Sequence, residues 1–313
     1  MVSVIVPAYN IAPYIEKCAK SILGQTYADI QLIIVDDGST DDTPMLCDKI
    51  AERDSRVVVI HKENGGVSSA RNAALKVATG KYISFIDGDD FIEPTLYEDA
   101  INAMQQNDAG CFMFEYVLDK ENGSCTHSVT PSKYGVIDGQ KAFLYSIGNE
   151  HRFLWGKIIE RELLKGITFN EDIILGEDTL FVCQALLGLK RAVYTSNAYY
   201  HYVIREGSAV HSPFKRKKLS GVVAYQKVLK MAEENKLESA IITCKDSVVN
   251  LAFQLIRKIF ESPKYPEQKQ DLKYLKNAIL EHSKALLKSK KVARKTKIKI
   301  LITKLSVRLI RWI

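Results

Sequence analysis

Short apolar runs alternate with amphipathic segments over the first ninety residues of the chain. Between these runs, apolar residues spaced three or four apart predict helices, as at Ile15, Cys18 and Ile22. We expect the third such helix to run to Thr79 and to end at Gly80, a common C-terminal stop. Buried strands separated by helices are typical of an α/β fold with a doubly wound, mostly parallel sheet. The four predicted strands, nearly continuous in apolar residues, cover residues 3–7, 31–35, 56–60 and 82–86.

Beyond about residue 110 the pattern changes, because strand and helix signals no longer alternate. From residue 212 onward it is helical apart from interruptions at Pro263 and Pro266. We therefore expect two domains, an α/β domain over residues 1–211 and a smaller helical domain over 212–313. The other predicted elements are a strand over 111–117, a helix near 138–146, a short helix that ends at Leu164, a helix over 177–187 and a strand over 192–203.

Composition places the chain among ordinary soluble globular proteins, with 46% hydrophobic and 26% charged residues. This excludes a disordered chain, a collagen-like repeat and a disulfide-stapled miniprotein. No apolar run reaches the roughly 20 residues of a spanning helix, and the N-terminus lacks the features of a signal peptide. The cysteines show no metal-finger or CxxC spacing, which favours a reduced, cytoplasmic compartment. They are Cys18, Cys47, Cys111, Cys125, Cys183 and Cys244.

Positive charge is concentrated at the C-terminal end. Residues 284–313 contain eight Lys, three Arg and no Asp or Glu, whereas the formal net charge of the whole chain is only +7. The rest of the chain is therefore mildly acidic. A basic amphipathic helix is typical of binding to an anionic membrane surface. The alternatives are a solvated charged face packed on the α/β domain, or nucleic-acid binding, for which we find no accompanying motif.

Acidic residues follow two of the predicted strands at the point where each ends. Asp36 and Asp37 follow the second strand, and Asp87-Gly88-Asp89 follows the fourth. Ligands of open α/β sheets bind beyond the carboxyl ends of the strands. Two carboxylates together with substrate phosphates are a typical Mg²⁺ or Mn²⁺ site in nucleotide-dependent enzymes. Each cluster alone also fits a turn or a helix cap, but like charges at one sheet edge favour a bound cation.

Four motifs in order resemble the family 2 glycosyltransferases with the GT-A fold: VSVIVPAYN, VDDGSTDDT, ENGGVSSARNAAL and YISFIDGDDFI. A weaker similarity continues through WGKIIERELL, LGEDTLF and YYHYVIREGSA to about residue 211. The resemblance implies a Rossmann-like GT-A domain with a nucleotide-binding half over residues 1–108 and an acceptor-side half over 109–211.

The resemblance also implies which side chains surround the donor nucleotide. Asp37 stands where the family bonds the uracil ring, and Pro7 and Tyr9 stand beside the nucleobase. Lys62 and Arg71 fall in the segment that lines the nucleotide-sugar pocket.

The sequence Asp87-Gly88-Asp89 corresponds to the DxD motif of the family. By this resemblance Asp87 lies towards the ribose and Asp89 holds Mn²⁺ or Mg²⁺. Such a metal stabilises the leaving diphosphate as a Lewis acid, so the leaving group needs no protonation. The candidates on the diphosphate side are His201, Arg205 and Ser208, and His201 is also a candidate metal ligand.

Two further roles follow from the resemblance. Asp178, next to Glu177, stands at the place of the general base that takes the proton of the acceptor hydroxyl. Both acids also suit the start of a helix, where they would complement its dipole. Trp155 and Lys157 stand on the acceptor side. The aromatic run over residues 199–202 favours half-buried strand packing.

The sequence therefore predicts an inverting, metal-dependent transferase, peripheral on the inner face of the cell membrane. It would move a hexose or N-acetylhexosamine from a UDP-sugar to a glycan or lipid-linked glycan of a cell-surface polysaccharide. The alternatives are a sugar nucleotidyltransferase and a non-catalytic nucleotide-sugar-binding protein. A nucleotidyltransferase should carry a glycine-rich loop with a basic residue directly after the first strand, and Ala8-Tyr9-Asn10 does not fit that pattern.

Overall fold

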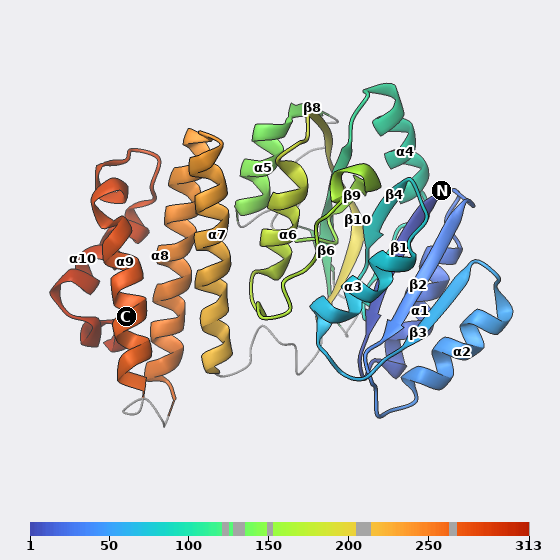
Figure 1. The fold of residues 1–313 in the computed structure, drawn as a ribbon, viewed down its shortest axis with the longest axis horizontal. Coiled ribbons are helices and arrows are strands. Elements are labelled where there is room, and N and C mark those ends of the chain that lie inside the picture. The colour runs from blue at the N-terminus through green and yellow to red at the C-terminus, as the bar shows by residue number, and fades with distance from the viewer. Residues whose placement is uncertain (121–124, 128–134, 149–152, 205–213, 263–267, 313) are drawn as a thin grey trace. The chain divides into compact units, whose positions relative to one another are not determined.

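The computed structural model describes residues 1–120, 125–127, 135–148, 153–204, 214–262 and 268–312 (Figure 1). The chain divides into two compact units, and each unit is made of three separate stretches of the sequence. Two short segments that precede residue 211 group with the C-terminal helices rather than with the α/β part. Unit 1 comprises Met1–Ala142, Phe153–Glu171 and Ala185–Glu206, and unit 2 comprises Phe143–Arg152, Asp172–Gln184 and Gly207–Ile313.

Unit 1 begins with the predicted parallel sheet. Its strands are ordered β3-β2-β1-β4, and each neighbouring pair is parallel, which confirms the predicted α/β class. The helices α1 and α2 share a buried core with alternate residues of β1 such as Val4, while α3 packs against β1 and β2 through residues outside that core. The elements are β1 (Val2–Ala8), α1 (Ala12–Leu23), β2 (Ile30–Asp36), α2 (Thr43–Arg53), β3 (Val57–His61), α3 (Val67–Val77) and β4 (Tyr82–Phe85).

The sheet continues past β4 in the order β9-β6-β10-β5. Strand β9 is antiparallel to both β4 and β6, whereas β6 and β10 are parallel. The sequence pattern missed β9, since we expected only a helix up to Leu164 there. The helix is a 3₁₀ turn, η1 (Arg161–Leu164), that follows the strand. The elements are β5 (Phe91–Ile92), α4 (Leu96–Gln106), β6 (Cys111–Lys120), β7 (Cys125–His127), β8 (Gly135–Asp138), α5 (Gly139–Ile147), β9 (Lys157–Glu160) and β10 (Arg191–Ile204).

Gly80 is not the C-terminal stop of α3, which corrects the expectation from sequence. The helix ends at Val77 with Ala78 as its C-cap. Gly80 instead passes close to β1, because a Cβ atom there would lie 2.6 Å from the backbone nitrogen of Ser3. Its N–H donates a hydrogen bond to Ser3 Oγ at 2.8 Å. The missing side chain therefore serves the close approach of two backbone segments.

Unit 2 is built around helices of the C-terminal third, as the sequence predicts. α8 packs against α7 and α9, and α10 packs against α8 and α9. α8 is the one helix of the described residues long and apolar enough to cross a membrane by composition, but it buries residues such as Val248 and Phe253 in this helical core. Pro263 and Pro266 lie outside the described residues. The helices are α6 (Glu177–Leu186, its last residues in unit 1), η3 (Arg216–Leu219), α7 (Ser220–Glu234), α8 (Glu238–Phe260), α9 (Lys269–Lys288), α10 (Arg294–Leu305) and η5 (Val307–Trp312).

Candidate active site

The candidate site lies at the carboxyl ends of the four parallel strands in unit 1. The strand order brings the segments after β3, β2, β1 and β4 to one edge of the sheet. These segments hold most of the residues that the sequence assigned to the donor nucleotide. This is the edge at which open α/β sheets bind ligands.

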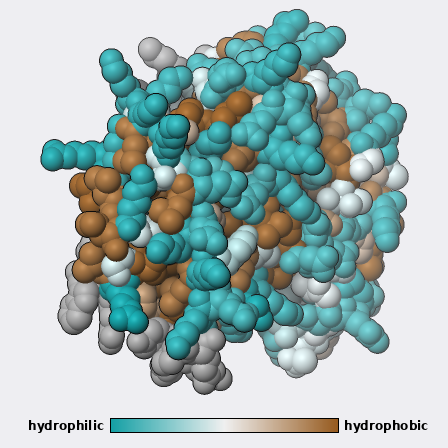
Figure 2. All heavy atoms as spheres, turned by 60° about the vertical axis from the view of Figure 1, so that its left-hand side comes forward, coloured by the Kyte–Doolittle hydropathy of each residue, from teal (hydrophilic) through white to brown (hydrophobic). Residues whose placement is uncertain are grey.

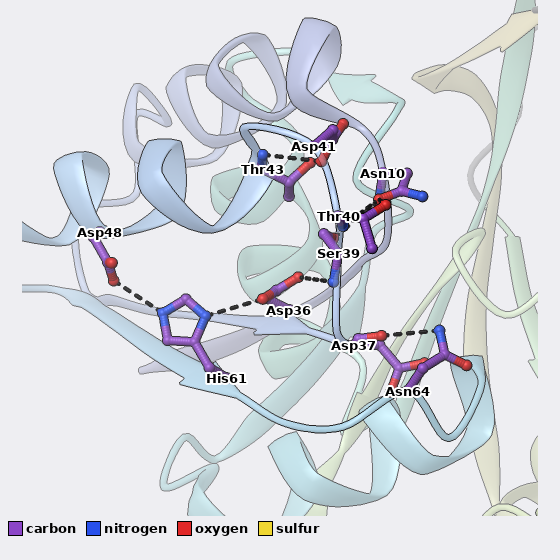
Figure 3. A network of polar contacts seen from close by, with 10 residues as sticks. All are labelled: Asn10, Asp36, Asp37, Ser39, Thr40, Asp41, Thr43, Asp48, His61 and Asn64. Atoms are coloured by element: carbon purple, nitrogen blue, oxygen red, sulfur yellow. Dashed lines mark hydrogen bonds and ion pairs between the residues drawn. The ribbon is translucent and has the colours of Figure 1, made fainter.

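Asp37 is held in a cradle of donors after β2. Its Oδ1 accepts hydrogen bonds from Lys62 Nζ at 2.6 Å and from the Gly65 N–H at 3.0 Å, and its Oδ2 accepts one from the Gly66 N–H at 2.7 Å. Asn64 Nδ2 donates to the Asp37 backbone oxygen at 2.9 Å, as drawn in Figure 3. The carboxylate is buried, so its charge is balanced by Lys62 rather than by water. A nucleobase N–H would have to share these oxygens, and the predicted role of Asp37 in base recognition stays a prediction.

The backbone of this cradle depends on glycine. Gly66 has φ +86° and Gly38 has φ +73°, a region that L side chains rarely adopt. A Cβ atom on Gly38 would also lie 2.8 Å from the backbone nitrogen of Asn64. Gly38 therefore lets the segments after β2 and β3 approach each other.

Asp36 belongs to a second cluster, which the sequence did not reveal. His61 lies with Nδ1 3.0 Å from Asp36 Oδ2 and Nε2 3.0 Å from Asp48 Oδ1 (Figure 3). Although burial acts to raise it, hydrogen bonds from His61 and Ser39 lower the pKa of Asp36 below its usual value. Hydrogen bonds to Asp36 and Asp48 raise the pKa of His61. No local sequence pattern predicts this contact, because Asp36 and His61 meet only as register partners in the parallel pairing of β2 and β3.

Residues that follow β1 are hydrogen-bonded to residues that follow β2. The Asn10 N–H donates to Ser39 Oγ at 3.0 Å, and the Thr40 N–H donates to Asn10 Oδ1 at 2.8 Å. Asp41 accepts from the Thr43 N–H at 3.0 Å. Asp41 thus accepts from the first backbone N–H of α2, as expected for an acidic cluster that caps a helix. Asp42, at the N-cap position of α2, makes no side-chain cap hydrogen bond.

Pro7 and Tyr9 lie at and beyond the end of β1, just before Asn10 in the chain. The Tyr9 side chain is 50% exposed, and Pro7 is partly buried. Their predicted contact with a nucleobase stays a prediction, but an exposed aromatic ring at the ligand-binding edge is suited to stacking on a planar base.

Arg71 and Asp87 form an ion pair at the DxD sequence. Arg71 Nη2 donates to Asp87 Oδ1 at 3.0 Å, and the Arg71 side chain is almost fully buried. Gly88 lies close to its neighbours, because a Cβ atom there would lie 3.1 Å from the Pro7 carbonyl oxygen and would displace Ile11 Cδ1, which is 2.4 Å away. Gly88 thereby packs the DxD turn against the end of β1.

Asp90, which we did not single out from the sequence, anchors this turn to β10. Its Oδ2 accepts a hydrogen bond from Tyr200 Oη at 2.5 Å, and its Oδ1 accepts from the Val203 N–H at 2.8 Å. Tyr200 Oη accepts in turn from the Asp87 N–H at 3.2 Å. Burial and the neighbouring charges of Asp87 and Asp89 raise the pKa of Asp90 well above its usual range.

Trp155 and Lys157 lie in the interior of unit 1. The Trp155 ring stacks between Phe153 and Tyr200, with centroids 4.6 Å and 4.2 Å away. Lys157 is buried, and its Nζ donates to the Phe153 carbonyl oxygen at 2.9 Å. The structure therefore gives both residues packing contacts, and through Tyr200 it connects Trp155 to Asp90. Their role on the acceptor side stays a prediction.

His201 lies on β10 with a carboxylate at each ring nitrogen. Nδ1 is 2.9 Å from Asp119 Oδ2 and Nε2 is 2.7 Å from Glu93 Oε1, while the ring stacks on Phe91 with centroids 4.2 Å apart. A metal ion bound to His201 would have to replace one of these carboxylates. The predicted metal and diphosphate roles of His201 stay predictions. The other two diphosphate-side candidates, Arg205 and Ser208, lie outside the described residues.

Glu177 and Asp178 form the first turn of α6, in the segment that belongs to unit 2. The predicted start of this helix is therefore confirmed. Gly176, with φ +78°, precedes the helix, and its carbonyl oxygen accepts from the Leu180 N–H at 3.0 Å. The assignment of Asp178 as the general base stays a prediction.

The acids of the DxD turn fit the expected metal in their chemistry. Oxygen ligands suit Mg²⁺ and Mn²⁺. Within the part of the chain that the structure describes, no group of three or more His, Cys, Asp or Glu side chains is arranged to hold a metal. The two acids of the DxD turn therefore fit an ion that is bound by one or two carboxylates and by substrate phosphates, rather than an ion enclosed by protein alone.

Comparisons with known proteins agree with these features. Residues 3–195 match the profile described as Glycosyl transferase family 2. The uncharacterized glycosyltransferase EpsJ of Bacillus subtilis is 32% identical over 225 residues, which are 69% of this chain and 64% of that protein. The minor teichoic acid biosynthesis protein GgaB of Bacillus subtilis is 31% identical over 226 residues, 69% of this chain and 24% of that protein. The chain thus spans less than two thirds of the length of these relatives.

Among solved structures, S. aureus TarS residues 1–349 in complex with UDP-GlcNAc superimposes with a TM-score of 0.69 at 22% identity. The match covers 99% of this chain and 87% of that chain, which confirms the predicted GT-A fold followed by a helical region. Since the family profile covers more than half of the chain and a relative above 30% identity covers more than two thirds of it, this protein belongs to the family 2 glycosyltransferases.

Proposed function

We propose that this protein transfers a hexose or N-acetylhexosamine from a UDP-sugar to a hydroxyl group of a glycan or lipid-linked glycan. The observation that carries the proposal is the single sheet edge at which the Asp37 cradle, the exposed Tyr9 ring and the DxD turn meet in unit 1. The TarS complex supports a UDP-sugar donor, because that protein binds UDP-GlcNAc on a similar fold. The name of GgaB, a teichoic acid biosynthesis protein, supports an acceptor in cell-surface polysaccharide synthesis.

Asp89 and Asp87 would hold Mn²⁺ or Mg²⁺ together with the donor diphosphate. The metal supplies Lewis-acid stabilisation of the charge that develops on the departing diphosphate. Arg71 already neutralises Asp87 at 3.0 Å, so the DxD turn does not present two uncompensated carboxylates. Asp90 and Tyr200 hold the backbone of the turn in place, which orients both acids without a contribution from the ligand.

The acceptor hydroxyl loses its proton as its oxygen attacks the anomeric carbon. We assign this proton to Asp178, and to Glu177 only as the weaker candidate. A positioned carboxylate is a usual general base for a hydroxyl group. One direct displacement exchanges the bond to the diphosphate for a bond to the acceptor, so the configuration at the anomeric carbon inverts.

We place this reaction in the cytoplasm, at the inner face of the cell membrane. Five cysteines among the described residues, Cys18, Cys47, Cys111, Cys183 and Cys244, are buried and free of disulfides, which supports a reducing compartment. A lipid-linked acceptor would require the protein to work close to a membrane surface.

A screen of nucleotide sugars for UDP release, with Mn²⁺, Mg²⁺ or excess chelator, tests the proposal. We expect release that stops with chelator, and Asp89→Asn should weaken metal-dependent UDP binding at least tenfold, about 1.4 kcal/mol. Asp42→Asn, at the exposed N-cap acid of α2 that makes no side-chain cap hydrogen bond, is the control and should leave UDP binding unchanged. UDP binding without release would indicate a nucleotide-sugar-binding protein. Formation of inorganic diphosphate from a nucleoside triphosphate and a sugar phosphate would indicate a nucleotidyltransferase.

A further inference from the structure

α10 has a buried face and, opposite to it, a face with exposed apolar residues. Its inner face packs Thr296, Ile300 and Thr303 against the other helices of unit 2. On the opposite side, spacings of three and four residues bring a second set of apolar side chains onto one face of α10, and an exposed leucine of η5 follows beyond the extended Ser306. We call this set the outer stripe: Ile298 (46% exposed), Leu301 (50%), Leu305 (79%) and Leu309 of η5 (43%).

Packing within unit 2 does not account for the outer stripe. A helix that only completes a helical core needs one apolar face, and its solvent side is usually polar. Figure 2 turns forward the side of the molecule on which α9 and α10 are drawn in Figure 1, and apolar side chains reach the surface there among hydrophilic ones. Contiguous exposed apolar side chains rimmed by polar residues mark an interaction surface.

The charges that α10 and η5 themselves carry have one sign. Exposed cations flank it, and residues 284–313 contain no Asp or Glu. In the described part of the chain none of these flanking cations forms an ion pair with a carboxylate, although other surface lysines such as Lys230 do. By contrast, Lys299 points inward, with Nζ 2.6 Å from Asn250 Oδ1. The flanking cations are Arg294, Lys295, Lys304 and Arg308.

We propose that the outer stripe and its flanking cations bind the surface of a membrane that contains anionic lipids. The leucines and Ile298 would enter the boundary between headgroups and acyl chains, and the cations would stay at the level of the lipid phosphates. A second copy of this chain fits the surface less well, because it would bring cations against cations. A soluble polyanion would use the cations but not four exposed apolar side chains.

This inference goes beyond the proposed reaction, because it assigns a surface of unit 2 and uses none of the donor-site residues in unit 1. A protein held in this way would meet a lipid-linked acceptor along the membrane rather than from solution. Membrane binding and UDP release can therefore be measured, and can fail, independently.

Flotation of the full-length protein with lipid vesicles tests the proposal. We expect binding to vesicles of phosphatidylglycerol and phosphatidylcholine, decreasing with salt, and none to phosphatidylcholine alone. The double variant Leu301→Ser/Leu305→Ser should bind at least tenfold more weakly. Its matched control is Ile174→Ser/Val223→Ser, which changes two other exposed apolar residues of unit 2 and should bind like the wild type.

A second pair of variants tests the cations. Lys304→Gln/Arg308→Gln should lower vesicle binding and its salt dependence, whereas Lys217→Gln/Lys227→Gln, at exposed lysines elsewhere in unit 2, should not. All variants should keep the circular dichroism spectrum and the UDP-release rate of the wild type.

Three results would overturn the proposal. The first is no binding of the wild type to anionic vesicles at low salt. The second is loss of binding to both vesicles and a soluble polyanion such as heparin in the charge variant, with the leucine variant unaffected, which would indicate a polyanion site. The third is a change from dimer to monomer in the leucine variant without a change in vesicle binding, which would indicate self-association.

Discussion

Tyr200 connects the aromatic core of unit 1 to the DxD turn through a single hydroxyl group. Its Oη donates to Asp90 and accepts from the Asp87 N–H, and its side chain is fully buried. Tyr200→Phe would leave a carboxylate oxygen of the buried Asp90 and the N–H of the partly buried Asp87 without these partners. We expect the free energy of unfolding to fall by about 1–3 kcal/mol. Urea unfolding measures this loss.

The control for this change is Tyr274→Phe, which removes a hydroxyl from an exposed tyrosine of α9 and should change stability by less than about 0.5 kcal/mol. Metal-dependent UDP binding separates positioning from stability alone. If Tyr200→Phe is destabilised but binds UDP like the wild type, the hydroxyl supports the fold and does not orient the DxD acids.

Asp178 is the residue on which the proposed chemistry depends most. Asp178→Asn keeps the shape of the side chain and removes the proton acceptor, so kcat should fall by about 10²- to 10⁴-fold, the usual range for a general base. UDP affinity should stay nearly unchanged, because the predicted nucleotide and metal contacts belong to other residues. Steady-state kinetics and calorimetric titration with UDP measure the two effects.

Glu177→Gln, at the neighbouring residue, is the comparison and should lower kcat less than Asp178→Asn does. A larger loss from Glu177→Gln would make Glu177 the base. An equal loss of UDP affinity and turnover in Asp178→Asn would instead assign Asp178 to the donor or metal site.

At the scale of single residues, the sequence predicted the acids that follow strands but not their partners. Asp37 and Asp87 were found because a short motif at the end of an apolar run is a local signal. Lys62 and Arg71 were assigned to the lining of the nucleotide-sugar pocket, and their ion pairs with these two acids appear in the structure. Asp90 was missed because its partners lie more than a hundred positions away on β10, a separation that no local pattern reports.

At the scale of elements, His61 fastens the end of β3 to the end of β2 and to α2. Because its pKa is raised, this contact stabilises the fold fully below the pKa of about 6.5 for an unfolded histidine, and the stabilisation is lost as pH rises through the higher folded value. Asp36, whose pKa is lowered, contributes above about pH 3.9 and loses that contribution as pH falls through its lower folded value.

We therefore expect His61→Gln to be more destabilising at pH 5.5 than at pH 8.5. Urea unfolding of both proteins at the two pH values measures the difference. Asp48→Asn, which removes one of the two carboxylate partners, should show a smaller change of the same sign. A difference between wild type and His61→Gln that is equal at both pH values would contradict the pKa shift of His61.

The same scale explains which strands could be predicted. β1, β2 and β4 are buried along almost their whole length, so each appears as an uninterrupted apolar run. β3, at the edge of the sheet, is an apolar run as well although Val58 is exposed. β9 has four residues and lies between β4 and β6, where Ile158 and Ile159 pair with residues distant in the sequence. A run this short does not distinguish a strand from the end of a helix, because its placement depends on the partner strands.

At the scale of the whole molecule, the chain is divided in a way that its linear pattern does not report. The donor-site residues belong to unit 1, whereas the segment that carries Asp178 groups with the C-terminal helices. A boundary near residue 212 is a reasonable expectation from a change to helical periodicity. The return of two short segments to unit 2 depends on tertiary packing, which leaves no compositional signal.

The basic tail is part of the core of unit 2 as well as of its surface. Leu286, Ile300 and Ile310 are fully buried, so deletion of residues 284–313 would remove packed core atoms together with the outer stripe. We expect this deletion to destabilise unit 2. Two adjacent residues separate the effects without a deletion: Ile300→Ala, on the inner face, should lower the free energy of unfolding by about 2–5 kcal/mol. Leu301→Ala, on the outer stripe, should lower it by less than about 0.5 kcal/mol while weakening vesicle binding. Equal losses of stability would show that both faces of α10 are structural.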